Sequence, residues 1–199
     1  MKKKTDLPLA KLGRIAPAAI LAAAGMLAAG QAAAVTVTVE NFQKAESPWD
    51  MAFLPDGTMF FTEKCKGLSV RLPNGDVKAL LGVAGTSGYS MVGNDLFCDG
   101  QAGVQGVAVD PQFASNRYVY VYSSSQGSNR KYGGYSNVVM RLKVDASLSS
   151  VSDRVDIIDD LGYKPKKSNH PFGGPGAHNG GRIRFSPADG FLYVAIGDN

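Results

Sequence analysis

The sequence is poor in cysteine and histidine, with two of each among 199 residues. Neither cysteine belongs to a Cys-x-x-Cys-His sequence, which excludes a c-type haem attachment site. The glycine run Gly173–Gly176 lacks a Gly-Lys-Ser/Thr ending and no helix pattern follows it, so it is not a phosphate-binding loop. Beyond the N-terminal segment, no stretch shows the apolar spacing of a long amphipathic helix. The lack of such a helix pattern indicates an all-β chain.

A surplus of positive charge is also absent once the N-terminal segment is set aside. The formal net charge of +4 comes from 21 Lys and Arg against 17 Asp and Glu. Residues 1–34 hold five of the basic residues and one acidic residue, so 16 of each remain in residues 35–199. The remaining chain therefore carries no electrostatic signature of nucleic-acid binding.

Residues 1–34 have the order of a secretory signal peptide: basic residues, then an apolar run, then a small-residue cleavage site at Ala32–Ala34. The apolar run, Ile15–Ala29, is too short and too rich in alanine to favour a stable membrane span. The alternative is an N-terminal anchor that stays uncleaved. We expect an exported protein, periplasmic or secreted, whose folded part lies in residues 35–199.

The two cysteines, Cys65 and Cys98, are predicted to form one disulfide, because an exported protein matures in an oxidising compartment. Closing a loop of this length would stabilise the fold by about 3 to 4 kcal/mol on the chain-entropy model. Two unpaired thiols are the alternative.

Three segments share one plan: an alternating apolar strand, a turn around a proline, and a second strand rich in β-forming residues. They are Trp49–Glu63, Gly103–Tyr122 and Gly181–Gly197, with their prolines at positions 55, 111 and 187. Further strands are expected at Leu68–Leu72 and Val138–Val144, as a four-stranded blade requires. Hairpins that recur with a common turn predict a β-propeller. A β-sandwich is the alternative.

The segments between these strands are predicted to be loops rich in Gly, Ser, Asn and Pro, at Gly82–Gly100, Ser123–Ser136 and Leu161–Asn179. Val35–Val39 is strongly β-prone but has no obvious partner nearby. Because propellers often close by pairing an N-terminal strand with the last blade, its partner would lie beyond this sequence.

His178 is the main catalytic candidate. It stands in a glycine-rich loop directly before the third hairpin, and its flanking glycines allow backbone to approach a ligand closely. Asp198 ends the second strand of that hairpin and is expected to orient one imidazole nitrogen, leaving the other as a general base. The alternatives are a surface histidine and a turn aspartate.

Gln101 precedes the second hairpin as His178 precedes the third. Corresponding positions of successive blades converge on one face of a propeller, so Gln101 is a candidate ligand contact; otherwise it is a solvated amide. His170 is interpreted as a loop residue. Lys164, Lys166 and Lys167 are interpreted as a solvated cluster, or as the rim of a sugar pocket.

The segments Pro48–Gly57, Gly100–Phe113 and His178–Asp198, in this order, resemble the soluble quinoprotein sugar dehydrogenases of the glucose/sorbosone dehydrogenase family. The resemblance covers essentially all of residues 35–199. It implies the N-terminal part of a six-bladed propeller, with about the first half of the blades present.

The resemblance further implies oxidation of an aldose at its anomeric carbon with pyrroloquinoline quinone (PQQ) and calcium. His178 corresponds to the family's general base, Asp198 to the carboxylate that orients it, and Gln101 to a side chain that contacts the quinone. The calcium ligands and the remaining quinone ligands are expected beyond the end of this chain, which is therefore expected to be inactive alone. A sugar substrate and an electron acceptor of unknown identity are the expected partners.

Two rival functions remain open at this point: a non-catalytic propeller that binds carbohydrate or protein, and a metal-dependent lactonase on a similar propeller. The fold does not separate them, because propellers carry many functions. The loop Gly82–Gly93 resembles an insertion, so the preferred sugar need not be glucose.

Overall fold

The computed structural model describes residues 37–90, 92, 94–164, 174 and 176–197. The predicted signal peptide lies outside these residues. Two units divide the chain, residues 1–42 and residues 43–199. In the first unit, residues 37–42 form no strand. The expected partner of Val35–Val39 lies beyond this sequence, so the pairing of this segment stays a prediction. Val37 and Val39 are exposed there and pair with no sheet, which a short β-prone segment requires for stability.

The first blade of the second unit is a four-stranded antiparallel sheet in which chain neighbours are sheet neighbours. Its strands are β1 (Pro48–Phe53), β2 (Met59–Glu63), β3 (Gly67–Arg71) and β4 (Val77–Gly82). The proline-containing turn between β1 and β2 is closed by Asp56, whose Oδ1 accepts the Thr58 N–H at 2.9 Å. Gly57 takes a φ of 87° in this turn, which a residue with a side chain would rarely adopt.

The second blade has the same order with longer strands. It comprises β5 (Val104–Val109), the short helix α2 (Phe113–Asn116), β6 (Tyr118–Gln126), β7 (Tyr135–Val144) and β8 (Val151–Leu161). The predicted loop Ser123–Ser136 is therefore too long, because its two ends are strand. Ser123, Ser124 and Ser125 are fully buried in β6. Their hydroxyl groups form hydrogen bonds to neighbouring side chains or backbone in place of the hydrogen bonds to water that burial removes.

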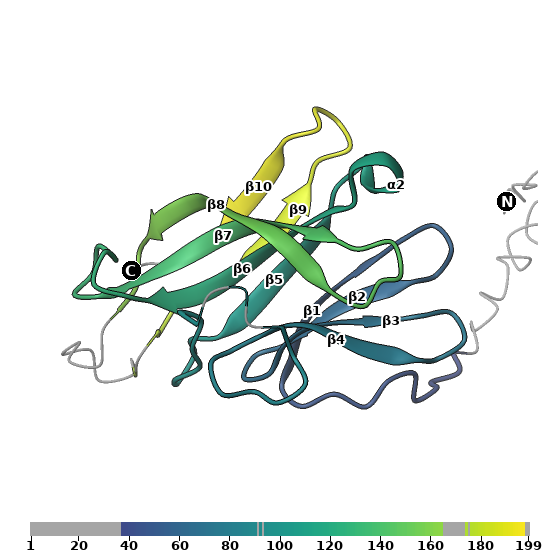
Figure 1. The fold of residues 1–199 in the computed structure, drawn as a ribbon, viewed down its shortest axis with the longest axis horizontal. Helices are drawn as coiled ribbons and strands as arrows, with labels where there is room; N and C mark the ends of the chain where they lie inside the picture. Colours follow the sequence, from purple (N-terminus) through teal and green to yellow (C-terminus); the bar gives the residue numbers. More distant parts are fainter. Residues whose placement is uncertain (1–36, 91, 93, 165–173, 175, 198–199) are drawn as a thin grey trace, which may run out of the picture. The chain divides into compact units, whose positions relative to one another are not determined.

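A third hairpin consists of β9 (Arg182–Phe185) and β10 (Leu192–Ala195). In Figure 1 it lies next to the second blade and is drawn in yellow. Two consecutive four-stranded meanders followed by a third hairpin confirm the all-β propeller prediction and exclude the β-sandwich. Among the described residues, no helix has the length and apolar character needed to cross a membrane.

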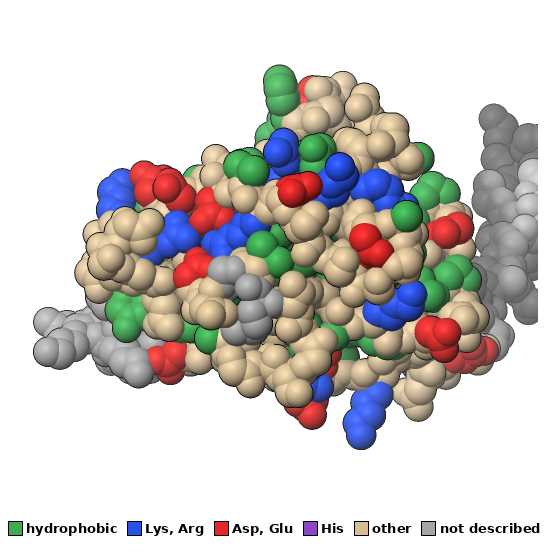
Figure 2. Space-filling view, viewed as in Figure 1, with side chains coloured by type: hydrophobic (Ala, Val, Ile, Leu, Met, Phe, Trp, Pro, Cys, Tyr) green, Lys and Arg blue, Asp and Glu red, His purple; other side chains and the backbone are tan. Residues whose placement is uncertain are grey.

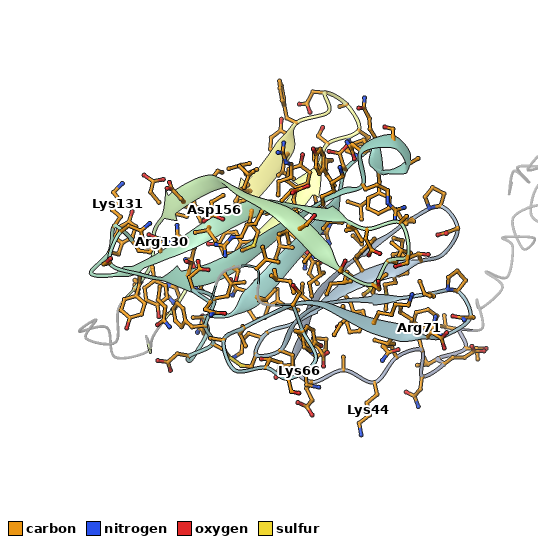
Figure 3. The ribbon with its side chains drawn as sticks, in the orientation of Figure 1. Lys44, Lys66, Arg71, Arg130, Lys131 and Asp156 are labelled. Atoms are coloured by element: carbon orange, nitrogen blue, oxygen red, sulfur yellow. A yellow bond between two sulfur atoms is a disulfide. The ribbon has the colours of Figure 1, made fainter. Side chains whose placement is uncertain are left out.

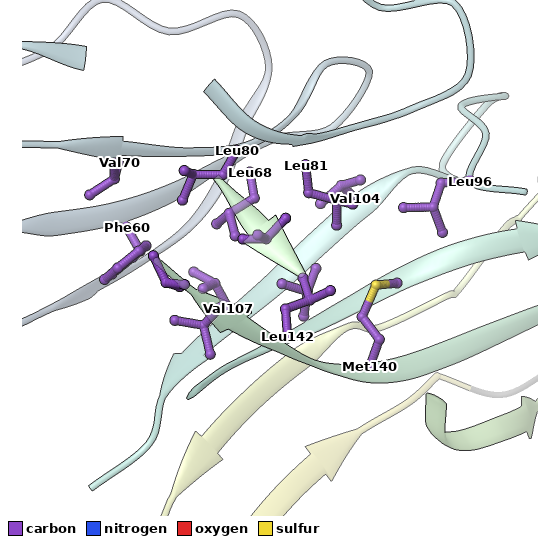
Figure 4. Close-up of a cluster of buried hydrophobic side chains, with 14 of the residues drawn as sticks. Phe60, Leu68, Val70, Leu80, Leu81, Leu96, Val104, Val107, Met140 and Leu142 are labelled. Carbon is purple, nitrogen blue, oxygen red and sulfur yellow. The ribbon is translucent and has the colours of Figure 1, made fainter. Parts of the chain in front are cut away.

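Apolar side chains fill the interface between the first and second blades. Phe60, Leu68 and Leu81 of the first blade pack in one buried cluster with Met140 and Leu142 of the second (Figure 4). A smaller cluster of Ala108, Tyr122, Val139 and Ile183 joins the second blade to the third hairpin. Full burial of one such aliphatic side chain contributes about 1.5 to 3 kcal/mol, so these clusters set the relative positions of the sheets.

A buried carboxylate connects the first strands of the two blades and of the third hairpin. Asp50 on β1 accepts the Val107 N–H of β5 at 3.1 Å and an Arg184 Nη2–H of β9 at 2.5 Å. Arg182 adds a third contact, Nη1 to Oδ1, at 2.8 Å. The hydrogen bond to Asp50 raises the pKa of Arg184. Because the carboxylate is 1% exposed, it needs these donors to offset its lost hydration.

The surface drawn in Figure 2 carries basic and acidic side chains side by side rather than a patch of one sign. This distribution agrees with the equal numbers of basic and acidic residues in residues 35–199.

Candidate functional site

Two of the predicted site residues meet at the loops that precede β5 and β9. The backbone N–H of His178 donates a hydrogen bond of 3.0 Å to the side-chain Oε1 of Gln101. The residues are 77 positions apart in the chain and belong to consecutive propeller units. The structure thus brings the backbone of His178 together with the side-chain amide of Gln101, two residues that the sequence placed at equivalent positions of two repeats.

A tight turn presents Gln101. Asp99 and Ala102 exchange backbone hydrogen bonds across it, with N to O distances of 3.3 and 2.9 Å. The backbone O of Gln101 accepts the side-chain Nε2–H of the buried Gln105 at 3.0 Å. The Gln101 side chain itself is exposed. With Oε1 engaged by His178, its Nε2 amide group is the part that can donate to a ligand.

The predicted disulfide between Cys65 and Cys98 is confirmed, with a Cα to Cα distance of 5.1 Å. Cys65 lies between β2 and β3, and Cys98 lies three residues before Gln101. The bond therefore ties the loop that carries Gln101 to the turn between β2 and β3, the two middle strands of the first blade. It also limits the loop's freedom in the unfolded chain.

His178 has a backbone conformation that residues with side chains seldom adopt, with a φ of 60°. Such a conformation costs of order 1 to 3 kcal/mol and persists only where the surroundings enforce it. Gly197 contributes to this, because a Cβ there would collide with the carbonyl O of His178. Gly176 likewise packs against Ala102, where a Cβ would lie 2.7 Å from the backbone N. These glycines allow close backbone contacts within the chain, and the predicted approach of backbone to a ligand stays a prediction.

A buried polar network holds the residue next to His178. Asn179 is 1% exposed, and its Oδ1 accepts the Asn137 Nδ2–H at 3.0 Å. Its Nδ2 donates to Ser124 Oγ at 3.1 Å, and its backbone O accepts the Tyr122 hydroxyl at 2.8 Å. Burial raises the pKa of Tyr122, so its hydroxyl keeps the proton that it donates. Side chains of β6 and β7 thereby fix the backbone on which His178 stands.

These network residues were missed at the sequence level. Ser124 lies within the segment predicted to be a loop, and no spacing in the sequence relates it to Asn137 or Asn179. The one available signal is that Asn179 directly follows the candidate base. A polar side chain in that place is either exposed or engaged by partners from other strands, and only the folded chain shows which.

Lys164 lies close to the histidine, because its Nζ is 3.5 Å from His178 Nδ1. Its backbone O accepts the Gly176 N–H at 3.0 Å. Lys164 is half-buried, and this contact is compatible with both interpretations of the three lysines, which stay predictions. Lys166 and Lys167 lie outside the described residues.

Asp198 and His170 also lie outside the described residues, so the expected pairing of Asp198 with His178 stays a prediction. Strand β10 ends at Ala195, and Gly197 already contacts His178. Within the described ranges, no three His, Cys, Asp or Glu side chains are grouped so that they could hold a metal ion.

The sequence of this chain matches a known protein family and two of its named members. The profile of the glucose/sorbosone dehydrogenase family matches residues 45–199. The aldose sugar dehydrogenase YliI of Escherichia coli (strain K12) is 33% identical over 172 residues, covering 84% of this chain and 40% of YliI. Quinoprotein glucose dehydrogenase B of Acinetobacter calcoaceticus is 26% identical over 202 residues, covering 92% of this chain and 38% of that protein.

A solved structure agrees with these relatives. The soluble aldose sugar dehydrogenase from Escherichia coli superposes with a TM-score of 0.60 at 28% identity, covering 82% of this chain and 42% of that one. This chain spans about two fifths of the length of these proteins. With the family profile matching most of its residues and a relative 33% identical along most of its length, the chain belongs to the glucose/sorbosone dehydrogenase family.

Proposed function

We propose that this chain contributes the general base and one quinone contact to an enzyme that oxidises an aldose at its anomeric carbon, with PQQ as the acceptor. The observation that carries the proposal is the hydrogen bond between His178 N and Gln101 Oε1, which joins the loops of two consecutive units. Two relatives of this chain are sugar dehydrogenases by name, which supports oxidation of a sugar.

In this proposal His178 takes the proton of the anomeric hydroxyl as the carbonyl bond of the lactone product forms. A positioned base of this kind contributes typically 100-fold to 10,000-fold to a rate. The strained backbone of His178 and the buried bonds of Asn179 support this role, because they fix the backbone that carries the imidazole before a substrate arrives. Asp198 is proposed to orient the ring.

One side chain of this site, the Gln101 amide, fits a quinone. A quinone presents carbonyl oxygens, which accept hydrogen bonds, and the exposed Gln101 carries an amide donor whose Oε1 is held by His178. Gln101 would therefore hold the quinone by one donated hydrogen bond. When bound, the quinone supplies the acceptor for the hydride that leaves the anomeric carbon. The proposed calcium ion and the other quinone ligands would be held by residues beyond this chain.

The compartment is proposed to be the periplasm or the cell exterior. The disulfide and the predicted signal peptide support export, since cytosolic thiols are kept reduced. The chain alone is proposed to be inactive, because it spans about two fifths of its relatives.

The test uses the complete natural protein, reconstituted with calcium and PQQ and assayed with aldoses and an artificial electron acceptor. His178→Ala should lower turnover at least about 100-fold while quinone binding, followed by its absorbance, is retained. Asp198→Asn should have a smaller effect in the same direction, because Asp198 only orients the ring.

Wild-type turnover in His178→Ala would overturn the assignment of the base. Sugar binding without any oxidation by the wild-type protein would favour the non-catalytic propeller instead.

A further inference from the structure

Gln105, on β5, is a fully buried amide beside the candidate site. Its Nε2–H donates to the backbone O of Gln101 at 3.0 Å, and its own backbone O accepts the hydroxyl of Thr62. Within the described part of the chain, Gln105 Oε1 has no hydrogen-bond partner. A buried acceptor in this state lowers stability, because the hydration that it loses on folding is not replaced.

A β-bulge sets the direction of the Gln105 side chain. Between the paired positions Val104 and Val107, β5 has one residue more than the facing part of β6, so Gln105 and Gly106 lie in the bulge. An extra residue of this kind turns a side chain away from its regular position on the strand, and bulges are frequent beside functional sites. Here the bulge turns the amide back toward the loop that precedes β5.

The same amide packs against the loop that follows His178. Gly181, three residues after His178, has a φ of 95°, and a Cβ there would lie 2.8 Å from Gln105 Oε1. A Cβ on Gly106 would collide with the backbone O of Gly181. The two loops of the candidate site therefore approach each other at Gln105.

One series of hydrogen bonds leads from Gln105 to both candidate residues. Gln105 Nε2 holds the backbone O of Gln101, and Gln101 Oε1 accepts the His178 N–H at 3.0 Å. The Gln101 side chain is exposed and has several rotatable bonds, so its direction depends on the backbone that carries it. A fixed backbone reduces the entropy that this side chain loses when it binds a ligand.

The ends of this loop are held by the turn between β2 and β3, independently of Gln105. Lys64 Nζ donates to the backbone O of Gly100 at 2.5 Å, and the backbone O of Lys64 accepts the Val104 N–H at 3.0 Å. Figure 3 shows Lys66, the last residue of this turn, at the first blade. Because of these anchors and the disulfide, the loop should stay folded when the Gln105 amide is removed.

We propose that Gln105 is a positioning residue: it holds Gln101, and through it the backbone of His178, without stabilising the fold. Its one side-chain hydrogen bond contributes little to folding, because Gln101 is exposed and water can replace the donor. The unpaired Oε1 opposes folding. An effect of Gln105 on quinone binding rests on the proposed function; its effect on Gln101 and His178 does not.

The test compares Gln105→Met with the wild type in the complete natural protein. Met fills a similar volume but removes the donor and the unpaired acceptor. The midpoint of urea unfolding of the cofactor-free variant should therefore be unchanged or higher. The dissociation constant for PQQ, measured by absorbance titration with calcium present, should rise about twofold to tenfold, as expected for one neutral hydrogen bond.

Gln112→Met is the matched control. Gln112 is an exposed glutamine of the same blade, at the start of α2, and its side chain forms no capping hydrogen bond. The control should change neither the unfolding midpoint nor the affinity for PQQ.

A second measurement needs no quinone. Hydrogen exchange of the His178 amide in the cofactor-free protein should be about twofold to tenfold faster in Gln105→Met, because its acceptor on Gln101 is held less firmly. The Val107 amide is the internal control. It lies on the same strand and donates to the buried Asp50, so its exchange should not change.

A double-mutant cycle tests whether Gln105 acts through Gln101. Gln101→Ala removes the amide that is proposed to bind the quinone, so adding Gln105→Met to it should weaken PQQ binding no further. Losses that add would show that Gln105 affects the quinone by another route, and they would overturn the proposal.

The remaining outcomes also decide. A lower unfolding midpoint in Gln105→Met would overturn the proposal, because the amide would then be structural. Unchanged exchange of the His178 amide would overturn it too, as would unchanged affinity in a protein whose wild type binds PQQ. If the wild type binds no PQQ but the His178 amide responds to Gln105→Met, the positioning is supported and the proposed function is refuted.

Discussion

The two interfaces of the second blade differ in chemistry. Toward the first blade it contributes to a continuous cluster of seventeen buried apolar residues. Toward the third hairpin the fully buried apolar cluster has four residues, and hydrogen bonds of Asn179 with Asn137 and Ser124 accompany it. Apolar burial is non-directional, whereas hydrogen bonds require particular orientations. The candidate site therefore lies at the interface whose contacts can fix a side chain's direction.

The largest expected effect breaks the apolar interface. Leu142→Ala removes a fully buried side chain from the cluster between the blades, and it should lower the free energy of unfolding by about 2 to 5 kcal/mol. Denaturant unfolding of the complete natural protein measures the loss. Turnover per folded molecule should stay at the wild-type value, because Leu142 does not contact the site.

Val155→Ala is the control for this variant. Val155 is an aliphatic strand residue of the same blade but is 44% exposed, so its truncation should change stability by no more than about 0.5 kcal/mol. Equal losses for the two variants would contradict the view that burial between the blades supplies the stability.

A smaller loss of stability is expected at the polar interface, together with a loss of function. Asn137→Ala leaves Asn179 Oδ1 and the backbone O of Gly162 without their donor, which costs about 1 to 3 kcal/mol of unfolding free energy. Because Asn179 adjoins His178, turnover measured at a temperature where the variant is fully folded should also fall. Thermal unfolding and steady-state kinetics separate the two effects.

Asn74→Ala is the matched control. Asn74 is an exposed asparagine in the turn between β3 and β4 and bonds only Asp76 within the described structure. If Asn137→Ala keeps full turnover at a temperature where it is folded, the buried network does not position the base.

The smallest expected effect concerns pH and the ion pairs that Asp95 forms with Arg130 and Arg154. Burial alone would raise the pKa of Asp95, but hydrogen bonds from Arg154 and Ser125 hold it below the usual value. A carboxylate with a depressed folded pKa contributes stability above its unfolded pKa of about 3.9, and this is lost as pH falls through the folded pKa. Stability should therefore decline below about pH 4, and the decline should be shallower in Asp95→Asn.

Urea unfolding of both proteins between about pH 3 and pH 7 checks this slope. The contribution should be modest and should weaken with added salt, because Asp95 is partly solvated and exposed ion pairs are screened. Identical slopes for the two proteins would show that this carboxylate does not link stability to pH.

Much of the framework is predictable because its signals are local. Alternating apolar residues with a proline turn define each hairpin, as in Trp49–Glu63; β1 begins one residue before that segment and β2 ends with it. Export and an even cysteine count predict the disulfide that the structure contains. The repeat also places Gln101 and His178 at equivalent positions, which their hydrogen bond reflects. In each case, local patterning, the compartment or the position within a repeat carries the information.

The errors have the opposite character. Ser123–Ser136 looks like a loop because serine and asparagine favour turns, yet Ser124 and Asn137 are strand residues that satisfy each other's polar groups. The contact of Lys164 with His178 was likewise not predicted from the sequence. Both were missed because the partner of a polar side chain lies elsewhere in the chain.

The sequence by itself determined the strand repeat, the disulfide partners and the placement of Gln101 and His178, since each depends on periodicity, compartment or position within a repeat. Tertiary structure alone decided the left-handed backbone of His178 and the buried bonds of Asn179. It also decided the ring contacts among Phe97, Tyr135 and Tyr163. The physical reason is that each of these joins residues distant in the chain. Their contacts exist only after apolar burial has brought the sheets together, and local sequence pattern does not encode that proximity.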